Sequence, residues 1–81
     1  MGQIRIEPRV QFDPCIVDEQ DGRLVYSILK IIEMLEKSFA DDGDPTPRRS
    51  AWEWYNYNIS SFKYMKDGPV FLEERDAGHP N

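Results

Sequence analysis

Residue types that carry out covalent catalysis are scarce in this sequence. The 81 residues include one histidine, His79, close to the end of the chain, and one cysteine, Cys15. Nucleophilic catalysis needs a serine or cysteine beside a base, and a phosphate-binding loop needs closely spaced glycines, and the sequence contains neither arrangement. Carboxylate pairs are unavoidable among fifteen acidic residues and carry no information. The sequence therefore predicts a protein that is not an enzyme, with no catalytic residue and no cofactor.

Three aspartates close together suggest a metal site at first sight. Asp41, Asp42 and Asp44 surround Gly43 in a polar segment that also contains two prolines. An EF-hand loop places its ligands over about 12 residues and ends in a bidentate glutamate, and this segment has neither property. We interpret it as a solvated loop between two helices, so no metal site is predicted.

Two adjacent arginines, Arg48 and Arg49, follow Pro47 where a helix is expected to begin. The N–H groups of a first helical turn carry partial positive charge, so two cations there break a local rule. One interpretation is that the arginines extend into water or pair with the preceding aspartates. The alternative is an anion site, in which both guanidinium groups and the helix N-terminus bind a phosphate or carboxylate. Trp52, four residues after Arg48, would then stack on a base, which makes a nucleotide the possible ligand.

An aromatic run occupies residues 52–57, which contain four aromatic side chains. Helical spacing places Trp54 and Tyr55 on the apolar face of the expected helix, so we predict that both are core residues. Trp52 and Tyr57 lie on the two flanks of that face, where a side chain is only half covered, and are the candidates for exposed aromatics. The candidate surface for a ligand or a partner consists of Arg48, Arg49, Trp52 and Tyr57.

Hydrophobic spacing predicts two helices. The first extends from Ser27, a favourable N-cap, to Phe39. The second extends from Pro47 to Phe62, with Thr46 as its cap. Asn58 falls on the apolar face of the second helix, where we expect a hydrogen-bonded core residue. The apolar stripe of the first helix consists of Ile28, Ile31, Ile32, Leu35 and Phe39.

The remaining segments have the pattern of strands. Residues 3–12 alternate around a proline, which predicts an edge strand. Cys15–Val17 and Leu24–Tyr26 flank Asp21-Gly22, the pattern of a β-hairpin, and Val70–Leu72 predicts a last short strand. The predicted fold is therefore α+β, with two α-helices packed on one face of a small antiparallel sheet of three to four short strands. Residues 1–75 would form this single domain, and residues 76–81 a flexible tail.

The order of these segments resembles a family of small phage- and prophage-encoded proteins. That family has a hairpin, a VYS-type helix start, an A-x-x-W-x-x-x-N helix and a G-P-x-F strand, and the similarity covers about residues 12–73. The matching positions are Tyr26, Ser27, Ala51, Trp54, Asn58, Pro69 and Phe71. The resemblance implies a phage context and supports the α+β fold, but it implies no reaction. The family pattern is acidic where this chain has Arg48 and Arg49.

Charge and size limit the partners. Fifteen acidic and ten basic residues give a net charge of −5, which disfavours non-specific nucleic-acid binding. No apolar segment is long enough for a membrane span, and the charges at positions 5, 7 and 9 predict that the first residues are not a signal peptide. A lone cysteine predicts a reducing cytoplasm, that of the host if the protein is phage-encoded. So short a chain often gains stability by oligomerisation, which predicts a symmetric homodimer with Trp52 or Tyr57 at or beside the interface.

Three functions remain open, and the third, a purely structural or virion component, is favoured by no feature of the sequence. The first is a non-enzymatic accessory protein that binds a host or phage protein, for example to inhibit host defence. The alternative is a protein that binds or sequesters a small ligand, such as a nucleotide or another anion, at the two arginines and Trp52. Acidity and the phage resemblance favour the first, while only the arginine pair favours the second.

Overall fold

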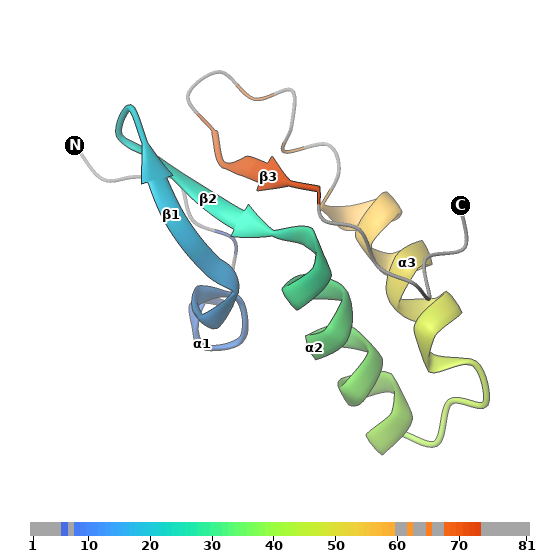
Figure 1. Cartoon of the computed structure of the whole chain (residues 1–81). Coiled ribbons are helices and arrows are strands. Elements are labelled where there is room, and N and C mark those ends of the chain that lie inside the picture. Colours follow the sequence, from blue (N-terminus) through green and yellow to red (C-terminus); the bar gives the residue numbers. More distant parts are fainter. Residues whose placement is uncertain (1–5, 7, 60–61, 63–64, 66–67, 74–81) are drawn as a thin grey trace.

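The computed structural model describes residues 6, 8–59, 62, 65 and 68–73. Three strands form one sheet in the order β1-β2-β3, and α2 and α3 pack against each other beside it (Figure 1). The predicted α+β class is confirmed, whereas the predicted tail, residues 76–81, lies outside the described residues. The elements in chain order are α1 (Arg9–Phe12), a 3-10 turn η1 (Asp13–Cys15), β1 (Ile16–Gln20), β2 (Arg23–Ser27), α2 (Ile28–Asp41), α3 (Pro47–Asn58) and β3 (Val70–Leu72).

The predicted hairpin is present between β1 and β2. Its turn consists of Asp21 and Gly22, with φ angles of 53° and 79°, and this left-handed pair is what a two-residue hairpin turn requires. Gln20 pairs with Arg23 next to the turn. The first strand begins later than predicted because Cys15 belongs to η1, and a bulge between Ile16 and Asp18 interrupts the pairing.

The sheet is mixed, so the prediction of an antiparallel sheet is wrong for its last strand. β3 runs parallel to β2, with Val25 opposite Val70 and Ser27 opposite Leu72. Helix α2 leads away from the sheet and α3 returns beside it (Figure 1). Arg23 Nε donates a hydrogen bond to the Gly68 carbonyl at 2.6 Å, which holds the beginning of β3 beside the beginning of β2.

The edge strand predicted before the hairpin is also wrong where the structure describes it. Pro8 precedes the short helix α1, in which Phe12 is buried whereas Val10 is 89% exposed. Pro8 is the N-cap, with φ −77° and ψ 135°, a conformation that the proline ring permits, and a helix start does not need the N–H that proline lacks. Ile6 is buried outside any strand, and its N–H donates to the Tyr26 hydroxyl at 3.0 Å.

The predicted first helix is confirmed and extends two residues further, to Asp41. The Ser27 side chain caps it by accepting a hydrogen bond from the Lys30 N–H at 3.1 Å. Four of the five predicted stripe residues are buried and Phe39 is half-buried, so the stripe forms the centre of the core.

The second helix begins at Pro47 as predicted but ends at Asn58, before the predicted Phe62. Its buried positions, Ala51 and Tyr55, are four residues apart, and Ile59 directly after the helix continues that row. This row does not include Asn58, which is exposed and donates its Nδ2 to the Trp54 carbonyl at 3.1 Å. The prediction that Asn58 is a core residue is therefore wrong.

Candidate functional site

The aromatic run on α3 divides between core and solvent. Tyr55 is buried, as predicted, and Trp54 is half-buried with its ring stacked on Phe12 at a centroid distance of 6.1 Å. Trp52 is half-buried, as expected for a flank of the apolar face, and packs edge-on against Tyr55 at 5.9 Å, so it is not the exposed ring that the candidate surface requires. Tyr57 is 89% exposed, in agreement with the prediction. Only Tyr57 among these four therefore presents most of its ring to solvent.

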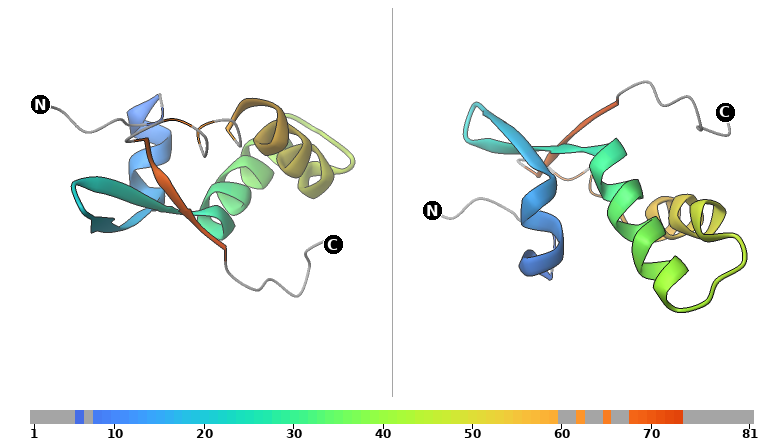
Figure 2. Two further views of the ribbon diagram at one scale, coloured as in Figure 1. Left: turned by 90° about the horizontal axis from the view of Figure 1, so that it is seen from above. Right: turned by 60° about the horizontal axis from the view of Figure 1, so that its bottom comes forward.

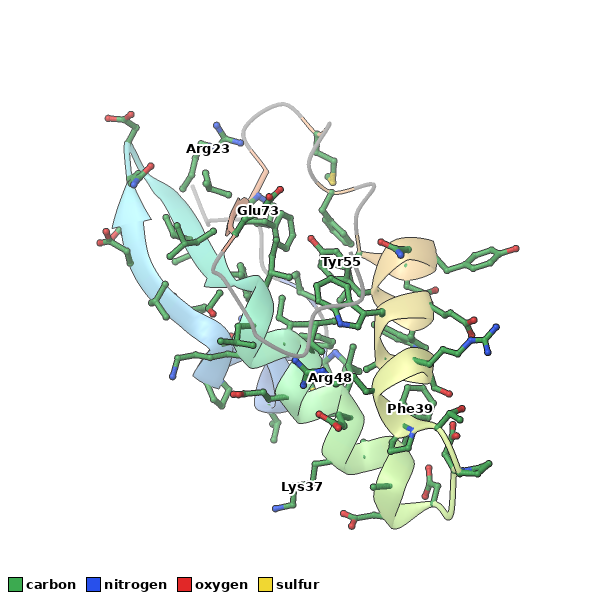
Figure 3. All side chains as sticks on the ribbon, turned by 45° about the vertical axis from the view of Figure 1, so that its right-hand side comes forward. Arg23, Lys37, Phe39, Arg48, Tyr55 and Glu73 are labelled. Atoms are coloured by element: carbon green, nitrogen blue, oxygen red, sulfur yellow. The ribbon has the colours of Figure 1, made fainter. Side chains whose placement is uncertain are left out.

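Arg48 contacts the neighbouring helix. Its Nη1 donates to Glu36 Oε1 of α2 at 2.8 Å, and about a third of each side chain is exposed. In Figure 3 the Arg48 side chain lies beside α2, away from the solvent-facing side of α3. Arg48 thus joins the two helices through a charge-assisted hydrogen bond.

Arg49 lies on the outer side of α3. Its Nε is 3.3 Å from Glu53 Oε2, one helical turn further on, and both side chains are mostly exposed. Pairs at this spacing contribute only about 0.2–0.5 kcal/mol to a helix. The structure therefore does not bring the two guanidinium groups together, since each contacts a different carboxylate on a different helix.

An aspartate of the chain itself occupies the beginning of α3. Asp44 accepts hydrogen bonds from the Thr46 N–H at 2.7 Å and from the Ser50 hydroxyl at 2.5 Å. These two bonds, that from Ser50 first, lower the pKa of the Asp44 carboxyl. Thr46, the predicted cap, makes no capping bond with its side chain. The N-terminus of α3 thus has a carboxylate of the chain itself beside it. Asp44 was predicted only to lie in a solvated loop between the two helices.

Tyr55 is the side chain on α3 whose pKa is clearly shifted. Burial, together with the negative charge of Glu73, raises the pKa of its hydroxyl to about 12. Within the described part of the chain this hydroxyl has no hydrogen-bond partner. Tyr55 also contacts Phe71 of β3 edge-on at 6.2 Å, and Figure 3 shows its ring between α3 and the sheet. Its ring contacts Trp52 of α3 and Phe71 of β3, so Tyr55 packs the helix against the sheet.

Other reactive groups are few among the described residues. Burial raises the pKa of the Cys15 thiol, with the charge of Lys30 as a smaller opposing effect, which disfavours the reactive thiolate form. Within residues 6, 8–59, 62, 65 and 68–73 no group of three or more histidine, cysteine, aspartate or glutamate side chains is placed to hold a metal ion. No helix in the same part of the chain has the length and apolar character needed to cross a membrane.

Comparison of the chain with protein-family models, with curated proteins and with solved structures finds no match in any of the three. The resemblance to phage-encoded proteins therefore stays a prediction.

Proposed function

We propose that this protein is a non-enzymatic accessory factor of phage type that acts by binding another protein. The observation that carries the proposal is the position of Tyr57, which is 89% exposed near the end of α3. Inhibition of a host defence protein is the form of this function that the phage resemblance suggests. A homodimer that presents two such surfaces is compatible with it.

The physical argument rests on the cost of leaving a large ring in water. A tyrosine side chain gains free energy when its ring is buried, and its hydroxyl still finds a partner in a polar interface, so tyrosine is enriched at binding surfaces. The exposed charged residues beside Tyr57 on α3, Arg49 and Glu53, make only a weak contact with each other. A partner is therefore able to use the ring as an anchor and these charges as a rim.

Nucleotide binding, the alternative, has less support. A phosphate would have to replace Glu36 as the partner of Arg48 and would meet the Asp44 carboxylate at the beginning of α3. Addition of ATP to the protein, followed by tryptophan fluorescence, tests this alternative directly. We expect no quenching, whereas quenching that weakens with salt and disappears in Arg49→Glu would support a nucleotide ligand over the proposal.

Affinity capture from a bacterial lysate tests the proposal, with two variants matched in exposure. Tyr57 on α3 and Val10 on α1 are both 89% exposed, so their replacement by alanine removes equally accessible side chains. We expect Tyr57→Ala to lose the captured protein and Val10→Ala to retain it. Capture that is unchanged in Tyr57→Ala would contradict the proposal. Trp52→Ala is a poorer probe because Trp52 packs against the core.

A further inference from the structure

Three aspartates in this chain are each followed directly by a glycine. The pairs are Asp21-Gly22 in the β1–β2 turn, Asp42-Gly43 after α2, and Asp67-Gly68 before β3. An aspartate before glycine forms a five-membered succinimide ring more readily than other aspartates, because no side chain hinders attack by the glycine nitrogen. Asp67 lies outside the described residues, but all three glycines are described. The structure therefore distinguishes the pairs by what holds each glycine N–H.

Two of the three glycine N–H groups are hydrogen-bonded. Gly43 N donates to the Ala40 carbonyl at 3.0 Å, and Gly68 N donates to the Met65 carbonyl at 3.1 Å. Gly68 is also crowded, since a β-carbon added there would lie 2.8 Å from the Met65 β-carbon. A nitrogen whose hydrogen points at a carbonyl must lose that bond before it attacks a carboxyl group. These contacts therefore oppose ring formation at Asp42 and Asp67.

The Gly22 N–H has no such restraint. It donates no hydrogen bond within the described part of the chain, and nothing lies within 4 Å of the position of an added β-carbon. Asp21 and Gly22 are both exposed, and Figure 2 shows their turn, in blue-green, at the end of the sheet away from α2 and α3. The Gly22 nitrogen is thus open to react.

The turn also permits the geometry that ring formation needs. The φ angles of 53° at Asp21 and 79° at Gly22 fit a type I′ turn, and rotation of the peptide between these residues gives the other hairpin turn, type II′. This rotation leaves φ of Asp21 nearly unchanged but brings its ψ to about −120°. At that angle the Gly22 nitrogen eclipses the β-carbon of Asp21, so it faces the side-chain carboxyl carbon.

We propose that Asp21 is a site of spontaneous isomerisation to isoaspartate. The Gly22 nitrogen forms a bond to the carboxyl carbon of Asp21, and its proton leaves with a carboxyl hydroxyl group as one water. Another water then adds to one of the two ring carbonyls and breaks its bond to nitrogen. Opening at the side-chain carbonyl restores aspartate, whereas opening at the main-chain carbonyl leaves the chain linked through the side chain. Water is the only co-reactant, and no group is oxidised or reduced.

Isoaspartate lengthens the main chain of the turn by one methylene group. The length of a hairpin turn sets the register of its strands, so the added group displaces the pairing of Gln20 with Arg23. The side chains of β1 are exposed except for the half-buried Ile16. We therefore expect the isomerised chain to lose pairing at this end of β1 while α2 and α3 keep their packing. The inference is independent of the proposed function, because it concerns the hairpin and not α3.

Peptide mapping of the full chain tests the proposal after prolonged incubation at neutral pH in water labelled with heavy oxygen. Each cycle of ring formation and opening inserts one heavy oxygen atom, and isoaspartate peptides separate from aspartate peptides in chromatography. We expect isoaspartate and label to accumulate at Asp21 at least about fivefold faster than at Asp42 or Asp67, the factor that one net hydrogen bond provides. In urea, where the structure is lost, the three rates should become similar.

Two matched variants isolate the effect of the turn. Asp21→Asn and Asp42→Asn each place an asparagine before a glycine at an exposed position, and asparagine forms the same ring with loss of ammonia instead of water. Asn-Gly is a favoured type I′ sequence, so Asp21→Asn should keep the hairpin. We expect Asp21→Asn to lose its new amide at least about fivefold faster than Asp42→Asn, as measured by the mass of the intact folded chain.

Equal rates at residues 21 and 42 in the folded chain would overturn the proposal, and so would faster modification at residue 42 or 67. A ratio that stays unchanged in urea would also overturn it, because the preference would then come from the local sequence and not from the turn. Absence of both isoaspartate and heavy oxygen at Asp21 would show that the ring does not form there.

Discussion

The β2–α2 unit, residues 23–41, and helix α3 share one core but are held in different ways. The unit buries aliphatic side chains such as Ile31 and Ile32, and Ser27 caps its helix. The described part of α3 buries only Ala51 and Tyr55, and Asp44 holds its beginning. The comparison indicates that apolar burial stabilises the β2–α2 unit. Polar contacts and edge-on aromatic contacts position α3. The core therefore constrains exposed positions on α3, such as Tyr57, less than it constrains the buried stripe of α2.

The largest expected effect is the loss of an aliphatic side chain from α2. Leu35 is 6% exposed, and Leu35→Ala should lower the free energy of unfolding by about 2–5 kcal/mol, the range for emptying a core leucine site. Tyr57→Ala on α3 should change it by less than about 0.5 kcal/mol, as exposed substitutions do. Urea denaturation measures both. Similar losses in the two variants would remove the distinction between the regions.

The hydroxyls of Tyr26 in β2 and Tyr55 in α3 allow the same comparison with a single atom removed from each region. The Tyr26 hydroxyl accepts a hydrogen bond from the buried Ile6 N–H, so Tyr26→Phe leaves this donor unsatisfied and should cost about 1–3 kcal/mol. The Tyr55 hydroxyl has no such partner in the described residues, so Tyr55→Phe should be neutral or slightly stabilising. Equal costs in denaturation would show that Tyr55 makes a bond of its own.

Tyr55 is also expected to make stability depend on pH in the alkaline range. The pKa of Tyr55 is raised from the ordinary value of 10.0 to about 12, so the unfolded chain ionises this group first. Its contribution is therefore intact below pH 10 and is lost as the pH rises from 10 towards 12. The alkaline loss of stability should be smaller in Tyr55→Phe than in the unmodified protein.

Substitutions at the N-caps of α2 and α3 should change stability by less than the core substitution in α2. Ser27→Ala removes a side chain that caps α2 and should cost about 0.5–2 kcal/mol. Thr46→Ala at the start of α3 should cost less than about 0.5 kcal/mol, because Thr46 makes no capping bond with its side chain. Thermal unfolding of both variants checks this order, and a greater loss in Thr46→Ala would reverse it.

The smallest expected effect concerns Asp44 and acid. Its pKa is lowered in the folded protein, so its contribution to stability is present above the ordinary carboxyl pKa and is lost as the pH falls through the lowered value. Asp44→Asn should therefore show a slightly smaller loss of thermal stability on acidification than the unmodified protein. Identical pH profiles would mean that Asp44 does not stabilise α3.

Local patterns predicted the β2–α2 unit well. The Asp21-Gly22 turn, the Ser27 cap and the aliphatic stripe each depend on a few neighbouring residues, and all three are present. Alternation at Val10 and Phe12 misled because a four-residue helix, too short to show a period, separates their side chains. The direction of β3 depends on the return path of the chain, which no local pattern encodes.

The features of the candidate site that depend on neighbouring residues in the sequence were also predictable. Helical spacing predicted the exposure of Tyr57 and the burial of Tyr55. It did not predict that Arg48 would reach Glu36, because that contact depends on how α2 and α3 pack. Asp44 left a weak signal in the sequence, an aspartate two residues before Thr46 at the expected start of α3, which is typical of a residue that bonds backbone N–H groups ahead of it.

The parallel pairing of β3 has a consequence for the order of folding. The hairpin closes over two residues, whereas the hydrogen bond from Arg23 to Gly68 spans 45 residues of chain. Closing a longer loop costs more conformational entropy, and sequence-distant contacts form more slowly. We therefore expect the hairpin and α2 to form early and β3 to dock last. The edge-on contact between Tyr55 of α3 and Phe71 of β3 would then form only in the last step of folding, so the position of α3 beside the sheet would be fixed only in completed molecules.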